Sequence, residues 1–115
     1  MTSQHGGLSP ERWAEFDFGR QILMIANELH RAAKLVSPAD AARRRSSLER
    51  VYALVDLTIA TNARPARRRE LLRWREILGE SYLANPPVPA SDRALLRALL
   101  RFDAGAAAQI PFVAG

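Results

Sequence analysis

The sequence predicts an all-α protein, arranged as an antiparallel up-down-up-down four-helix bundle. Apolar residues recur at the three- and four-residue spacing of amphipathic helices over most of the chain, and no segment alternates apolar and polar residues as a strand does. Runs containing proline interrupt this spacing at three places and so delimit four helical segments. A chain of 115 residues without cysteine suits a single domain whose core needs no disulfide.

The first two helices are expected to be the longest. Ser9 and Pro10 are typical of an N-cap and a first helical position, so the first helix is expected over residues 10–36. The second helix is expected over residues 38–61, because Ser37-Pro38-Ala39-Asp40 resembles a capping box. Short connections between successive helices favour antiparallel neighbours.

Two shorter helices are expected in the second half of the chain. The third follows Pro65 and places Leu71, Trp74 and Leu78 on one side. Residues 85–89, Asn-Pro-Pro-Val-Pro, cannot continue a helix and are expected to form a stiff connection. Ser91-Asp92 is then expected to cap a fourth helix that ends by Pro111 at the latest, or sooner at Gly105.

These helices divide the chain into one domain and two tails. The bundle domain is expected over residues 9–110, with a flexible N-terminal tail over residues 1–8 and a C-terminal tail over residues 111–115. The chain contains no run of eighteen apolar residues and no apolar stretch near Met1, so neither a membrane span nor a signal peptide is expected. A cytoplasmic protein is the resulting expectation.

The positive charge is concentrated in one third of the sequence. Of the 17 basic residues only Lys34 is a lysine, and the chain has a net charge of +5. Residues 38–75 hold ten arginines and four acids, a local net of +6, whereas the rest of the chain has a net of −1. A GC-rich genome also favours arginine, but this uneven distribution is typical of nucleic-acid-binding proteins.

The arginines expected to contact nucleic acid group around the helix starts. Arg43–Arg45 begins the second helix and Arg67–Arg69 begins the third, and these starts lie at opposite ends of an antiparallel bundle. Two separate basic patches, or patches merged by oligomerisation, are therefore expected. The full set of candidate residues is Arg43, Arg44, Arg45, Arg50, Arg64, Arg67, Arg68, Arg69, Arg73, Arg93 and Arg97, the last two expected beside Arg43–Arg45.

No catalytic, cofactor-binding or metal-binding residues are expected. His5 and His30 are the only histidines, and no group of histidines and carboxylates has the spacing of metal ligands. The chain has no phosphate-binding glycine-rich motif. The acids that can approach the core are expected to pair with arginines rather than to act in catalysis: Asp17, Glu28, Asp56 and Asp103.

Two apolar groups favour an oligomer. Trp13 lies close to Phe16 and Phe18, more aromatic surface than a terminal turn usually buries, which favours a contact between subunits. The apolar residues 110–113 are a second candidate for docking on a neighbour.

The segment from Ile22 to Ala108 resembles the accessory variability determinants of diversity-generating retroelements. It is also similar to the bundle proteins encoded in intervening sequences of bacterial ribosomal RNA genes. The resemblance rests on "LERVYALVDLTIA", "RRRELLRWREILGESYL" and "SDRALLRALLRFDAGAAA". It implies a basic homopentamer that partners a reverse transcriptase and its template RNA without itself catalysing DNA synthesis.

Two alternatives to an accessory nucleic-acid-binding protein remain open. One is a sequence-specific DNA-binding regulator that places the third helix in the major groove, although this helix lacks the Asn or Gln residues that read adenine. The other is a protein-interaction bundle whose arginines reflect genome composition.

Overall fold

The computed structural model describes residues 8–114, which fold into seven α-helices and one short 3-10 helix, without a strand among them. The predicted all-α class is therefore confirmed. The long helices are α2 (Phe18–Ala33), α3 (Ala41–Thr61), α4 (Pro65–Leu83) and α5 (Pro89–Leu100). The short ones are α1 (Pro10–Ala14), the 3-10 helix η1 (Pro38–Asp40), α6 (Ala104–Ala107) and α7 (Ile110–Val113).

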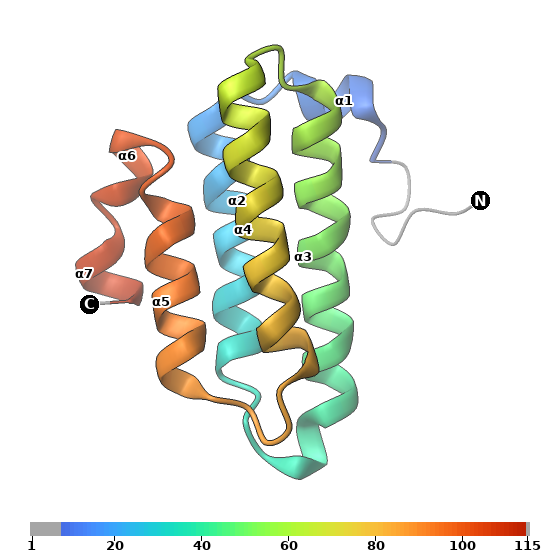
Figure 1. Ribbon diagram of the computed structural model, residues 1–115, viewed down its shortest axis with the longest axis vertical. Coiled ribbons are helices and arrows are strands. Elements are labelled where there is room, and N and C mark those ends of the chain that lie inside the picture. The colour runs from blue at the N-terminus through green and yellow to red at the C-terminus, as the bar shows by residue number, and fades with distance from the viewer. Residues whose placement is uncertain (1–7, 115) are drawn as a thin grey trace.

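The four long helices lie side by side around a shared core (Figure 1). α2 packs on α3 and α5, and α4 packs on the same two helices. The upper end of Figure 1 is where α2 and α4 begin, and the lower end is where α3 and α5 begin. We refer to them as the upper end and the lower end of the bundle. The completely buried core side chains include Ile22, Ile25, Leu29, Leu48, Val51, Val55, Leu71, Leu78 and Leu99.

The expected first helix, residues 10–36, is in fact two helices. α1 ends at Ala14, and the side chain of Asp17 starts α2 by accepting a hydrogen bond from the backbone N–H of Arg20 at 2.8 Å. An Asp carboxylate in this position satisfies one of the open donors of the first helical turn. The chain leaves the helical conformation after Ala33, three residues before the expected end.

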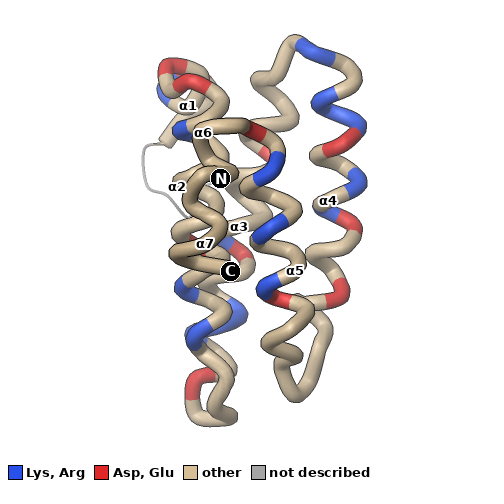
Figure 2. The backbone as a smooth tube through the Cα atoms, turned by 90° about the vertical axis from the view of Figure 1, so that its left-hand side faces the viewer, with Lys and Arg blue, Asp and Glu red and all other residues tan. Residues whose placement is uncertain are grey.

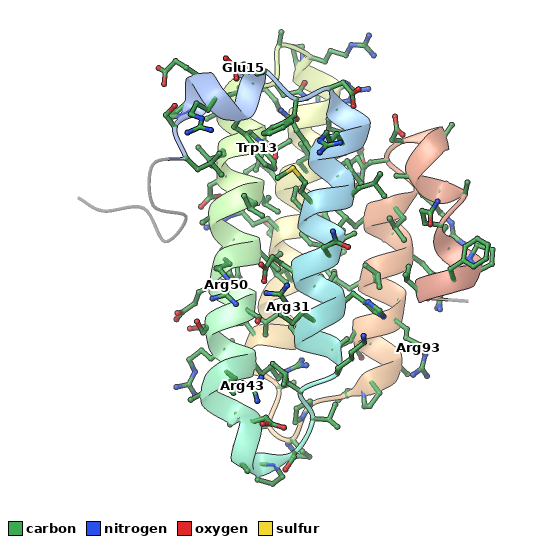
Figure 3. All side chains as sticks on the ribbon, turned by 180° about the vertical axis from the view of Figure 1, so that it is seen from behind. Trp13, Glu15, Arg31, Arg43, Arg50 and Arg93 are labelled. Atoms are coloured by element: carbon green, nitrogen blue, oxygen red, sulfur yellow. The ribbon has the colours of Figure 1, made fainter. Side chains whose placement is uncertain are left out.

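The break between α1 and α2 lets Trp13 turn back onto the bundle. Its side chain is completely buried, and its Nε1–H donates to the Thr58 hydroxyl of α3 at 2.9 Å. Gln21 of α2 donates to the carbonyl of Trp13 at 2.8 Å. In Figure 3, Trp13 lies beneath α1, toward the long helices. The expectation that Trp13 makes a contact between subunits is therefore wrong, because its own chain buries it.

The proline-rich boundaries occur close to where the sequence places them. Pro38 and Pro65 are the first residues of η1 and α4. Pro89 is likewise the first residue of α5, so this helix begins before the expected Ser91-Asp92 cap. Proline suits this position because it has no N–H to leave unpaired and its φ is already helical. Asp92 does not cap the helix; it is buried, and its partner is described below.

The C-terminal part of the chain returns along the outside of the bundle. α5 ends at Leu100, earlier than either expected limit, and the Asp103 side chain starts α6 by accepting from the N–H of Ala106. Residues 110–113, which overlap the expected C-terminal tail at 111–115, form α7. Ala114 is buried, and its carbonyl accepts a hydrogen bond from Arg97 at 3.0 Å. Of the expected tail at residues 1–8, only Leu8 lies within the described part, where it packs against the core.

No helix in residues 8–114 combines the length and the apolar character needed to cross a membrane. Within the same residues, no three His, Asp or Glu side chains gather closely enough to hold a metal ion.

Candidate nucleic-acid interface

Arg44, a candidate nucleic-acid contact, is buried in the lower end of the bundle. Its side chain forms two parallel hydrogen bonds with Asp92 of α5, Nη1 to Oδ2 at 2.8 Å and Nη2 to Oδ1 at 3.0 Å. Only 5% of Arg44 and 1% of Asp92 are exposed. The assignment of Arg44 to nucleic-acid binding is therefore wrong, because this guanidinium is enclosed and already neutralised by a carboxylate.

The same guanidinium links all four long helices. Besides Asp92 of α5, it donates to the carbonyl of Ala32 in the last turn of α2 at 3.0 Å and to that of Ser81 near the end of α4 at 3.5 Å. The carbonyls of a last helical turn have no partner within their helix and carry the negative end of the helix dipole. A positive charge at this point therefore stabilises two helix ends together.

Among the other lower candidates, Arg50 is largely occupied. It pairs with Glu28 of α2 at 3.2 Å and also donates to the hydroxyls of Ser46 and Ser47. Arg43 is exposed and carries a surface ion pair with Asp40 at 3.4 Å. Arg45 is exposed. Of the three consecutive arginines in the expected patch, only Arg43 and Arg45 are therefore exposed to solvent.

Arg93 and Arg97 of α5 differ in their surroundings. Arg93 is exposed near the start of the helix and so lies toward the lower end, as expected (Figure 3). Arg97 lies about one turn further along and donates a hydrogen bond to the carbonyl of Ala114. The expectation that it joins Arg43–Arg45 is wrong, since this bond holds Arg97 on the C-terminal segment.

The arginines at the start of α4 lie at the upper end and are mostly exposed. Arg64, Arg68 and Arg69 are exposed, and none of them takes part in an ion pair within the described residues. Arg73 is exposed as well and pairs with Glu70 one turn away at 3.2 Å. Surface pairs of this kind contribute little stability, so Arg73 can exchange its partner for another anion at little cost.

Arg67 is packed onto aromatic rings between three helices. Its guanidinium carbon lies 3.8 Å from the centre of the Phe18 ring of α2, and this ring meets Phe102, just beyond α5, edge to face. Partial burial lowers the pKa of Arg67, the nearby charge of Arg64 lowers it further, and Asp103 acts in the opposite direction. Arg64 and Arg67 are thus close together near the upper end.

Arg101, which the sequence reasoning did not select, completes this group. It follows the last residue of α5 and lines a groove between α4 and α5 together with Arg73. The groove has a volume of about 350 Å³ and an apolar floor of Trp74, Ile77 and Phe102. Arg101 lies at the end of its helix, whereas the predicted basic patches consist of arginines near helix starts, so the prediction does not include it. The feature that could have indicated Arg101 is the antiparallel packing of α4 and α5, which brings the end of α5 next to the first half of α4.

We call these six residues the upper arginine cluster: Arg64, Arg67, Arg68, Arg69, Arg73 and Arg101. Figure 2 shows basic residues along both α4 and α5, which face the viewer next to each other. The two arginine groups therefore lie at opposite ends of the molecule, as the sequence suggested. The upper group is the denser one once Arg44 and Arg50 are removed from the lower group.

Known proteins give no further guide: no family model, curated protein or solved structure matches this chain. The resemblance to the accessory proteins of retroelements therefore stays a prediction.

Of the four acids expected to pair with arginines, two do so and two, Asp17 and Asp103, form no ion pair within the described residues. Glu28 pairs with Arg31 and Arg50, and Asp56 with Arg75. Asp17 and Asp103 instead start α2 and α6. Each of these carboxylates thus has a structural partner, and the chemistry that the surface offers most directly is the binding of anions by guanidinium groups.

Proposed function

We propose that this protein binds nucleic acid through the phosphate backbone and has no catalytic role of its own. The observation that carries the proposal is the upper arginine cluster, which brings together six guanidinium groups from the first half of α4 and the end of α5. Guanidinium groups bind phosphate oxygens in pairs and remain charged at every physiological pH. The acids described near the cluster are Glu70, Glu76 and Asp103, three carboxylates against six guanidinium groups, so positive charge remains in excess.

The same surface favours recognition of the backbone over recognition of bases. The exposed face of α4 carries Arg69, Arg73 and Glu76, whereas its apolar stripe is buried in the core. Arginines are suited to phosphates, and without Asn or Gln beside them they can read guanine but not adenine, which limits the sequences that this face could specify. A sequence-specific regulator is therefore the weaker of the two nucleic-acid hypotheses, and protection of one defined operator in a footprinting assay would favour it.

The wider context of the proposal comes from the resemblance. We propose that the four long helices form an antiparallel up-down-up-down bundle and that several copies assemble, five if the resemblance holds. In such an assembly the upper clusters of neighbouring subunits would create one large basic surface. The partners we propose are a retroelement reverse transcriptase and its RNA or complementary DNA, which the protein would help to hold during mutagenic reverse transcription.

Binding to RNA and duplex DNA tests the function directly. The variant Arg68→Gln/Arg69→Gln removes two exposed members of the cluster, and Arg31→Gln/Lys34→Gln removes the same charge at the end of α2. In fluorescence anisotropy, the first variant is expected to weaken binding of every sequence by about tenfold, and the control by much less. For the wild type, log K should fall by about 0.7–0.9 per contacted phosphate for each tenfold rise in salt.

Equal losses in the two variants would show only a general charge effect, and unchanged binding after the first substitution would overturn the proposal. A triple variant that adds Arg101→Gln to Arg68→Gln/Arg69→Gln extends the test to α5. It should bind nucleic acid more weakly than the double variant if both helices contact the same backbone.

The groove between α4 and α5 supports a second candidate function, the binding of an acidic protein without nucleic acid. Ile77, which is 48% exposed, lines this groove together with two cations, Arg73 and Arg101, and one acid, Glu70. An apolar strip beside cations suits an acidic amphipathic helix. Failure to retain nucleic acid at moderate salt, together with binding of an acidic protein that Ile77→Glu abolishes, would favour this candidate.

A further inference from the structure

A second cavity opens at the lower end of the bundle, away from the upper arginine cluster. It has a volume of about 610 Å³ and lies between the turn after α2, the first turns of α3, and the last turn of α4 with the connection that follows it. Sites for small molecules commonly have volumes of about 300–1,000 Å³. The cavity is therefore large enough for a small organic ligand.

The walls of this cavity are partly apolar and incompletely covered. Leu83 is 80% exposed and Val36 is 44% exposed, although both line the cavity together with the buried Leu48. Pro38, Pro86 and Pro87 add further apolar surface. The C-terminal helices α6 and α7 lie on the outer side of α5 in Figure 1 and leave this opening uncovered. The exposed walls are suited to an apolar molecule.

The charged residues that line the cavity are Arg44 and Arg45, and no carboxylate is among the lining residues described. Asp92 neutralises Arg44, so Arg45 is the lining cation for which no ion pair is found within residues 8–114. Glu49 lies one turn further along α3, outside the lining, and accepts a hydrogen bond from the Tyr82 hydroxyl at 2.8 Å, which leaves its negative charge in place.

Tyr82 of α4 also lines the cavity. The hydrogen bond to Glu49 raises the pKa of Tyr82, burial and the charge of Glu49 raise it further, and the charge of Arg45 acts in the opposite direction. Arg45 and Glu49 therefore both act on this wall of the cavity. One cation and the apolar walls together define the chemistry of the ligand.

We propose that the lower cavity binds a small monocarboxylate with an apolar body, such as a medium-chain fatty acid. Its carboxylate pairs with the guanidinium of Arg45, and its chain lies against Val36, Leu48 and Leu83. A single negative charge matches the one lining cation for which no ion pair is found within the described residues, whereas a polyanion such as a nucleotide finds no second one in the lining. This site does not depend on the proposed nucleic-acid interface at the other end of the molecule.

Calorimetric titration of the whole protein with decanoate tests this proposal. Decanoate is expected to bind saturably, with one molecule per chain, and decanol, which has the same chain without the charge, about tenfold more weakly. Arg45→Gln should weaken decanoate binding about tenfold, a usual effect of losing a charge-assisted hydrogen bond. Arg68→Gln removes the same charge at the upper end and should leave binding unchanged. Both arginines are exposed, so neither substitution threatens the fold.

A second substitution tests the apolar walls. Leu83→Ser alters a side chain that contributes almost nothing to the core and should weaken decanoate and decanol binding to a similar extent. The proposal is overturned by absence of saturable decanoate binding, by equal affinities of decanoate and decanol, or by equal effects of Arg45→Gln and Arg68→Gln. Unchanged binding of both ligands to Leu83→Ser would also exclude this cavity as their site.

Discussion

At the scale of single residues, identical side chains in one run have different roles. Arg43, Arg44 and Arg45 are consecutive, yet Arg44 is buried against Asp92 while its two neighbours are exposed. Successive residues of a helix point about 100° apart, so a run of three arginines at the edge of a core directs one of them inward. A basic run at a helix start therefore overstates the charge available to a ligand.

The buried pair of Arg44 and Asp92 is expected to be sensitive to loss of either partner. Asp92→Asn or Arg44→Gln should lower the free energy of unfolding by about 3–5 kcal/mol, because the remaining charge is left buried without its counterion. Urea unfolding followed by circular dichroism measures the change. Arg45→Gln, the exposed neighbour, is the control and should stay within about 0.5 kcal/mol of the wild type. Similar small losses in all three variants would contradict the role of Arg44 as the link between helices.

His30 is expected to make the fold less stable in mild acid. Burial lowers its pKa below the ordinary value of 6.5, and the charge of Lys34 lowers it further. The unfolded chain then binds the proton at a higher pH than the folded chain, so stability is lost as the pH falls below 6.5 and through the folded pKa. Urea unfolding near pH 7.5 and near pH 5 should show a smaller loss for His30→Gln than for the wild type. Equal losses of stability in the two proteins would contradict this expectation, as would an NMR titration that gives His30 a pKa at or above 6.5.

At the scale of helices, the starts at Pro38 and Pro65 were predicted correctly, because a proline acts on the residues next to it. The fourth start was not: Pro89, expected in the connection, begins α5 before the predicted Ser91-Asp92 cap. The break at Asp17 was missed, since the apolar spacing continues through it and Asp17 resembles an ordinary polar position. The deciding feature is the burial of Trp13 against Thr58, which lies 45 residues further along the chain.

Helix α1 is expected to be held on the bundle mainly by this one side chain. Trp13→Ala should lower the free energy of unfolding by about 3–5 kcal/mol, the usual cost of removing a large buried side chain. Trp13→Phe should cost less, because it retains most of the apolar surface and loses the hydrogen bond to Thr58. Thermal unfolding measures both. Phe112→Ala removes an aromatic ring that is 79% exposed and should have little effect on stability. If Trp13→Ala, Trp13→Phe and Phe112→Ala were all about as stable as the wild type, α1 would be held on the bundle by other contacts.

At the scale of the whole molecule, the two proposed sites are separated along the bundle. The upper arginine cluster lies on the first half of α4 and the end of α5, and the cavity bounded by Val36 and Leu83 lies at the lower end. This separation results from the alternation of helix starts, which puts the start of α4 opposite those of α3 and α5 (Figure 1). The two proposed activities can therefore be removed separately by substitution.

Self-association is expected if the resemblance to the retroelement accessory proteins holds. Sedimentation velocity should then give a particle of five chains of 12.8 kDa each. Trp13 cannot supply the contact, because it is completely buried within its own chain. Exposed apolar side chains such as Leu72 and Phe112 remain available for it. A monomer at tens of micromolar protein would contradict the expectation without affecting the proposed nucleic-acid contact of a single chain.

The sequence by itself determined the helical class, the positions of the proline boundaries and the segregation of the charge. These depend on residues a few positions apart, where helix periodicity and capping act. Only the tertiary structure decided which arginines are available, where Trp13 lies, and that Arg101 belongs with Arg73. Arg44 and its partner Asp92 are 48 residues apart, and each alone resembles a surface charge. Burial depends on which distant groups meet, and no local pattern encodes that.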